Sequence, residues 1–167
     1  MGQYHLIVNE TKRQYLHPRF FNDGAKLMEF GNSGGATLLA LTVLLAQDNG
    51  GGGGDFGSRR EPDPSLAELV GSWAGDAIVI AGDYGDDDDS GLNLWQRAVG
   101  TDAYQNVSGM MIELLLQGGE TVDFDPLDIA REDGEPSRAD RCVKLYRAFP
   151  PREQLVDHKA QAWKVTT

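Results

Sequence analysis

The 167-residue sequence predicts a single domain of the α+β class, in which a small, mainly antiparallel sheet packs against two helices. Three observations predict this fold class. The N-terminus carries the pattern of a β-hairpin, two later segments are apolar enough for buried helices, and no regular alternation of strands and helices follows. A chain of this length buries about two-thirds of its unfolded surface, which is enough for one continuous core.

The first elements are a hairpin and a long helix. Residues 4–9 and 14–17 have the composition of paired strands, residues 10–13 form the turn between them, and Pro18 ends the second strand. Residues 26–30 fit either a strand or a helical turn. The apolar run from Ala36 to Ala46 predicts a central helix over residues 33–47, with Ser33 as its N-cap.

A Gly-rich segment follows this helix. Residues 48–64 include five consecutive glycines and two prolines, so we predict a flexible loop with nothing to pack. Ser65 then caps one expected helical turn over residues 65–70, because Glu68 follows at capping-box spacing.

The second half contains the most apolar strand. Residues 77–81 are apolar on both faces, which predicts a central strand. Two helices are expected over 92–99 and 109–117, the second capped by Ser108. The region 118–140 is acidic and contains prolines, so we expect a loop there, and residues 141–149 and 161–165 read as strands.

Composition narrows the class of partner. The chain has 26 acidic and 15 basic residues, a net charge of -11, so it repels nucleic acid and membrane phosphates and would attract a protein with a basic surface. The longest apolar run is too short to cross a bilayer, and the N-terminus lacks the features of a signal peptide. With a single cysteine, these features predict a cytoplasmic protein.

One motif resembles a catalytic sequence but does not fit the catalytic function. The sequence Gly-Asn-Ser-Gly-Gly-Ala at residues 31–36 is similar to the nucleophile motif of chymotrypsin-like serine proteases. Only 32 residues precede Ser33, too few to build the barrel that delivers the histidine base in those enzymes. A Gly-rich helix start explains the motif better. The five-glycine run likewise lacks the lysine and hydroxyl of a nucleotide-binding loop, and we expect no bound cofactor.

The acidic loop at residues 86–89 is the only weak candidate for a metal site. Asp86, Asp88 and Ser90 match the first half of a calcium-binding loop, but Arg97 stands where that loop requires a glutamate. We therefore expect no metal site. The alternative is a solvated loop whose acids precede the N-terminus of the next helix.

Two aspartates bracket the apolar strand at 77–81. Asp76 and Asp83 are seven residues apart and so lie at opposite ends of an element roughly 20 Å long. Asp83 follows the strand and forms a catalytic site only if the fold brings His17 or Glu29 near it. A turn residue beside glycine is the structural alternative for both aspartates.

Several segments resemble a group of uncharacterised small bacterial and phage-associated proteins that open with Met-Gly-Gln-Tyr. The resembling segments are residues 1–4, 15–18, 24–30, 73–76 and 82–84. The resemblance covers about the first 107 residues and implies a prokaryotic protein, but no activity or ligand. All six candidate binding residues lie in these segments: His17, Glu29, Trp73, Asp76, Asp83 and Tyr84.

No complete catalytic constellation is present in the sequence. We therefore expect a non-enzymatic binding or regulatory protein that acts on another protein. The alternative hypothesis is a small enzyme with a carboxylate-centred site near Asp83, His17 and Glu29.

Overall fold

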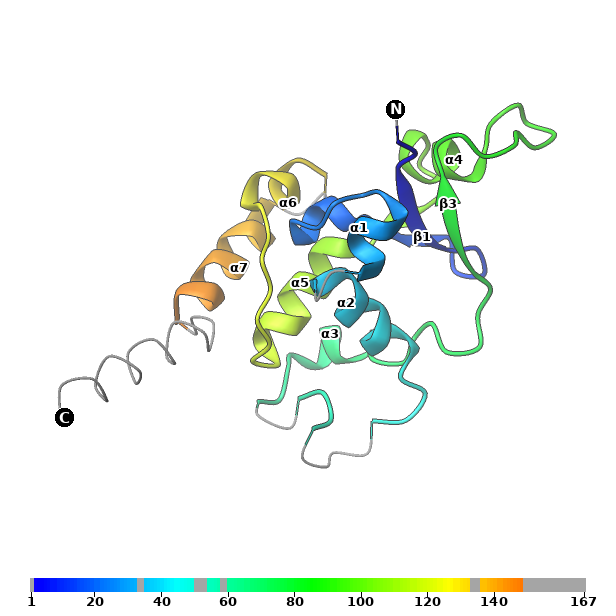
Figure 1. Cartoon of the computed structure of the whole chain (residues 1–167). Coiled ribbons are helices and arrows are strands. Elements are labelled where there is room, and N and C mark those ends of the chain that lie inside the picture. Colours follow the sequence, from blue (N-terminus) through cyan, green and yellow to red (C-terminus); the bar gives the residue numbers. More distant parts are fainter. Residues whose placement is uncertain (1, 33–34, 50–53, 58–59, 133–135, 149–167) are drawn as a thin grey trace, which may run out of the picture.

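The protein is an α+β domain, described by a computed structural model at residues 2–32, 35–49, 54–57, 60–132 and 136–148. Within these residues, four strands form one sheet in the order β3-β1-β2-β4. Seven α-helices occur in the described residues. Figure 1 shows β1 and β3 on one side of the molecule, α2 and α5 in the middle, and α6 and α7 on the opposite side. The predicted fold class is confirmed.

The sheet is built on the predicted hairpin. β1 (His5–Asn9) pairs antiparallel with β2 (Gln14–Leu16) and, on its other side, antiparallel with β3 (Ile78–Gly82). The short strand β4 (Gln105–Asn106), which the sequence pattern did not predict, pairs parallel with β2. The sheet is therefore mainly antiparallel, as predicted.

Both faces of β1 are buried because side chains alternate along a strand. Ile7 and Leu16 pack into the main core beneath the sheet. Leu6 and Val8 form a smaller cluster on the other face, where they pack with Ala98 of α4 (Leu94–Gly100). This helix begins with a complete capping box between Asn93 and Gln96.

The first turn of α2 is capped by a residue distant in sequence. The 3-10 helix η1 (Pro18–Phe21) and α1 (Leu27–Asn32) precede α2 (Ala36–Leu45). The N-cap of α2 is Gly35, and the predicted cap, Ser33, lies outside the described residues. The Asp23 carboxylate accepts hydrogen bonds from Thr37 N at 3.0 Å and Thr37 Oγ1 at 2.6 Å, so it satisfies a backbone donor of the first turn.

The next turn is also capped differently from the prediction. α3 (Pro64–Ala67) has Asp63 as its N-cap, and the Asp63 carboxylate accepts from Ser65 N at 2.9 Å. Gly71 then takes a φ of 70°, and a Cβ there would overlap the carbonyl oxygen of Ala46. The chain can follow α2 this closely only with glycine at that position.

The central helix is α5 (Ser108–Gln117), not the predicted helix at 33–47. Six consecutive residues of α5, from Met111 to Leu116, are buried, which requires neighbours on every side of the helix. α2 instead leaves Leu45 40% exposed. From the sequence alone, the apolar runs of α2 and α5 are equally good candidates for the central helix. The packing of α7 on α5 is what makes α5 the central one.

The C-terminal region differs most from the prediction. Residues 126–132 form α6 (Pro126–Glu132), and α7 (Pro136–Ala148) replaces both the end of the predicted loop at 118–140 and the predicted strand at 141–149. The apolar side chains Ala139, Cys142, Leu145 and Tyr146 recur at helical spacing and join the main core. The strand prediction for residues 141–149 was wrong because it followed the alternation at residues 143, 145 and 147 instead of this helical spacing. The strand predicted at 161–165 lies outside the described residues.

In the part of the chain that the structure describes, no helix is both long and apolar enough to span a membrane.

Candidate functional site

Trp73 and Asp76 lie at the end of the sheet where β3 begins. Trp73 is completely buried, and its indole Nε1 donates to Gln14 Oε1 at 2.8 Å. Asp76 accepts from Asn9 Nδ2 at 2.8 Å and lies 3.7 Å from Lys12 Nζ. Because Asn9 and Gln14 are paired neighbours on β1 and β2, these contacts tie the chain before β3 to the hairpin.

Asp83 and Tyr84 lie at the opposite end of β3, as the strand length predicted for Asp83. Asp83 Oδ1 accepts from Tyr4 N at 3.0 Å, and its backbone carbonyl accepts from Asn93 Nδ2 at 3.1 Å. Tyr84 is 64% exposed. Asp83 therefore connects the end of β3 to the residue before β1, and the Tyr84 side chain lies on the surface.

The three residues of the enzyme hypothesis are bonded to different partners. His17 Nδ1 accepts from Arg19 N at 3.3 Å, and Glu29 is exposed on α1 and pairs with Lys26 at 3.2 Å. β1 lies between the strand that precedes His17 and the strand that precedes Asp83. In the described part of the chain, no hydrogen bond or ion pair joins any two of the three side chains. The structure does not bring the three residues into one site.

His17 titrates far from the usual range of histidine. Burial, and then the positive charge of Arg19, lower the pKa of His17 to about 4. The folded protein therefore keeps this ring neutral at pH 7. Its Nδ1 accepts a hydrogen bond, so the proton is on Nε2.

The depressed pKa of His17 predicts an acid-sensitive contribution to stability. Between pH 6.5 and about 4 the unfolded chain binds a proton at His17 that the folded chain does not, so unfolding becomes easier as the pH falls. We expect wild type to lose up to about 3 kcal/mol relative to His17→Gln across this window. Urea denaturation of both proteins at pH 7 and pH 4 measures the difference. Parallel pH profiles would contradict this prediction.

In the acidic loop, the Asp88 side chain interacts with two neighbouring residues. The Asp88 carboxylate accepts from Ser90 N at 2.7 Å and lies 3.1 Å from Arg97 Nε. Hydrogen bonds from Ser90 are the main reason why the pKa of Asp88 is lowered. Arg97, which stands at the glutamate position of a calcium loop, thus pairs with one of the predicted ligands. No group of three His, Cys, Asp or Glu side chains in the described residues is arranged to hold a metal ion.

The outer edge of β3 has no neighbouring strand among the described residues. Glu10 N donates to Ala77 O and Asp83 N donates to Tyr4 O, both at 3.0 Å, which fixes the phase of the ladder between β1 and β3. Backbone groups alternate in direction along an antiparallel strand, so those of Ile78 and Ile80 face away from β1. Within the described residues these outward groups have no backbone partner. The prediction that this strand is central was wrong, because β3 is an edge strand.

The side chains of β3 remain partly uncovered on both faces of the sheet. Ile80 lies opposite Ile7 and is 49% exposed, whereas Val79 lies opposite Val8 and is 37% exposed. Each partner on β1 is completely buried. The sequence pattern thus described the apolar character of the strand correctly, but the covering expected on its outer side is missing from the described residues.

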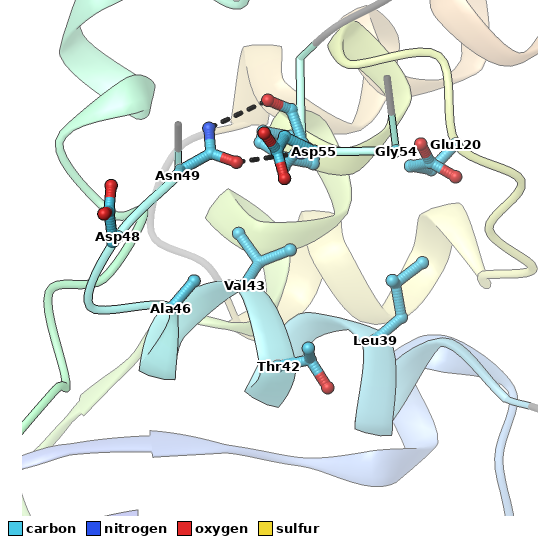
Figure 2. A pocket seen from close by; sticks show the side chains of 10 residues that line it. Leu39, Thr42, Val43, Ala46, Asp48, Asn49, Gly54, Asp55 and Glu120 are labelled. Carbon is cyan, nitrogen blue, oxygen red and sulfur yellow. Dashed lines mark hydrogen bonds between the residues drawn. The ribbon is translucent and has the colours of Figure 1, made fainter. Parts of the chain in front are cut away.

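An acid-rimmed pocket lies on α2 (Figure 2). It has a volume of about 350 Å³, and Leu39, Val43 and Ala46 form its apolar floor. Asp48 and Glu120 lie on opposite sides of it, and Asp55 lies between them. An apolar floor beneath carboxylates suits a cation on an aliphatic chain, such as a lysine side chain.

The described ends of the Gly-rich segment are fixed in place. Asn49 bonds to both the N–H and the carbonyl of Phe56 at 2.9 Å (Figure 2). The Phe56 ring lies so close to Gly118 that a Cβ there would overlap it. Residues 50–53 and 58–59 lie outside the described residues, so the predicted flexibility applies to a part that is not described. The expectation that nothing in 48–64 packs was wrong at Phe56.

Comparisons with known proteins assign no family to the chain. No protein-family model, curated protein or solved structure matches it. The candidate sites therefore depend on the geometry described above.

Proposed function

We propose that the protein is a non-enzymatic binding protein that takes up an extended segment of a basic partner along the outer edge of β3. The observation that supports this most is that the backbone groups of Ile78 and Ile80 face outward and have no backbone partner among the described residues. An extended peptide that joins a sheet edge pairs with such groups. The bacterial or phage origin implied by the sequence resemblance belongs to the same proposal.

The edge lacks the features that normally prevent unwanted pairing. Natural edge strands carry lysine, proline or a bulge, or are covered by another element. β3 has the sequence Ile-Val-Ile-Ala-Gly, contains no charged residue or proline, and pairs with β1 without a register break. Such a strand is expected to gain a partner when one is available.

Charge selects the kind of partner. The exposed acids Asp86, Asp87 and Asp89 lie shortly after β3, which ends at Gly82, and the whole chain carries a net charge of -11. A second copy of the chain is repelled by this charge, whereas a segment with Lys or Arg beside its strand is attracted. The acid-rimmed pocket on α2 offers a second position for a basic side chain.

Peptide selection tests the proposal. A library of displayed random peptides of about ten residues is selected on the wild-type protein, because strands of this length are typical. We expect the enriched peptides to alternate β-branched residues and to carry Lys or Arg at one end. Ile80→Pro removes an outward N–H that the sheet does not use, so it should abolish binding of these peptides without unfolding the domain.

A second variant and a control distinguish binding at this edge from general loss of structure. Ile80→Lys keeps the backbone donor but places a charge on the edge, and it should weaken binding at least about tenfold. Leu127→Lys makes the same change at a 60% exposed residue of α6, on the opposite side of the molecule (Figure 1), and should bind like wild type. Unchanged binding by folded Ile80→Pro and Ile80→Lys would overturn the proposal. Peptide-independent dimerisation lost in both variants would instead identify a second copy as the occupant.

A further inference from the structure

A second cavity lies beside β2 and α4. It has a volume of about 490 Å³ and lies between the segment 15–19, which includes the end of β2, and the segment 95–106, which includes most of α4 and all of β4. This size falls within the range of small-molecule sites. The residues that bear on its chemistry are Tyr15, His17, Arg19, Trp95, Tyr104 and Asn106.

Four rings contribute to a lining whose exposed surface is mostly polar. Tyr15 comes from β2, Trp95 from α4 and Tyr104 from the residues before β4, and the neutral imidazole of His17 is the fourth ring. Tyr15 is buried, and the other rings are partly buried. Flat side chains contribute large contact areas and stack on flat ligands. The lining therefore favours a planar molecule.

Two buried hydrogen-bond donors of the lining have no acceptor in the described residues. They are Trp95 Nε1 and Asn106 Nδ2. The orientation of the Asn106 amide is set by its oxygen, which accepts from Ser108 N at 3.0 Å, so the unpartnered atom is the nitrogen. A buried donor without an acceptor costs free energy, and a ligand oxygen that reaches it as the side chains shift would remove that cost.

His17 supplies a third donor. Its Nδ1 accepts from Arg19 N at 3.3 Å, so Nε2 carries the proton of the neutral ring. Arg19 and Asp102 contribute one charge of each sign to the lining. The cavity is thus rich in neutral donors and close to electrically balanced, which favours oxygen acceptors over a highly charged anion such as a polyphosphate.

We propose that this cavity binds a small planar ring that carries oxygen acceptors at its edge. Two sources share this chemistry, an aromatic carboxylate and a heteroaromatic ring with carbonyl groups. Trp95 Nε1–H and Asn106 Nδ2–H donate to the oxygens, and Tyr15 and Tyr104 contact the ring. This site is independent of the β3 edge.

Titration with defined probes tests the site. Benzoate represents the first source and uracil the second. Cyclohexanecarboxylate, which has the same charge as benzoate but is not planar, is the matched control ligand. The readout is the indole N–H resonance of Trp95 in two-dimensional NMR spectra, assigned by its loss in Trp95→Phe. We expect a saturable shift with benzoate or uracil, and at least tenfold weaker binding of cyclohexanecarboxylate.

Variants locate the binding in the cavity. Asn106→Asp keeps an oxygen for Ser108 N but removes the free donor and adds a negative charge, so it should weaken binding of the active probe at least tenfold. Gln105→Glu adds the same charge at the preceding exposed residue, which does not line the cavity, and should bind like wild type. The proposal is overturned by three results: no saturable shift with either planar probe, equal binding of cyclohexanecarboxylate, or unchanged binding by Asn106→Asp.

Discussion

Trp73→Ala is expected to lower the free energy of unfolding by about 3–5 kcal/mol, the usual cost of deleting a large buried aromatic side chain. Trp73 has no exposed surface, and its truncation also leaves Gln14 Oε1 without its indole donor. Urea denaturation measures the change. Tyr84→Ala is the control, because Tyr84 is 64% exposed and its loss should cost less than about 0.5 kcal/mol. A cost below about 1 kcal/mol for Trp73→Ala would show that Trp73 is not a core residue.

The second large effect is expected where α7 packs on α5. Glu113 is buried on α5 and accepts from Arg138 Nε at 3.0 Å and from Arg141 Nε at 2.6 Å. The double variant Arg138→Leu, Arg141→Met removes both arginines that pair with Glu113 and should destabilise the protein by about 3–5 kcal/mol, because it leaves a buried carboxylate without these cations.

Adding Glu113→Leu to that double variant should restore most of the lost stability, because an apolar contact of similar volume can replace a buried ion pair. Denaturant unfolding of wild type, the double variant and the triple variant provides the comparison. If the triple variant is no more stable than the double variant, burial of Glu113 is not the cause of the destabilisation.

Local signals in the sequence were sufficient to predict some elements. The hairpin at residues 4–17 follows from two strand patterns around a short turn, and β1 and β2 occupy it. The helices at 92–99 and 109–117 correspond to α4 and α5 within two residues at either end. In each case the signal and its structural consequence lie within a few residues of each other.

Contacts between distant segments explain the failures at α2 and β3, and an ambiguous local period explains the failure at α7. The cap of α2 comes from Asp23, which is 14 residues before the Thr37 that it binds. The apolar pattern of β3 predicts burial of both faces, but it does not show which strand, if any, lies on each side. α7 was missed because its apolar residues fit a period of two over a short window and the helical period over a longer one.

The candidate sites follow the same division. Strand length alone placed Asp76 and Asp83 at opposite ends of β3, and the structure confirms this. The sequence did not reveal the open edge of β3 or the cavity beside His17, because both depend on which segments lie side by side. A strand apolar on both faces and followed by four aspartates was the one signal that could have indicated the edge.

Amide hydrogen exchange of Ile78 and Ile80 in complex with a selected peptide tests the proposed strand addition most directly. In the free protein their N–H groups face away from β1, whereas those of Val79 and Ala81 face toward it. We predict that peptide binding slows exchange at Ile78 and Ile80 at least about tenfold, as expected for newly formed ladder hydrogen bonds, with little change at Val79 and Ala81. Unchanged exchange at Ile78 and Ile80, with protection appearing instead around Asn49 and Phe56, would contradict the proposal and locate binding at the acid-rimmed pocket.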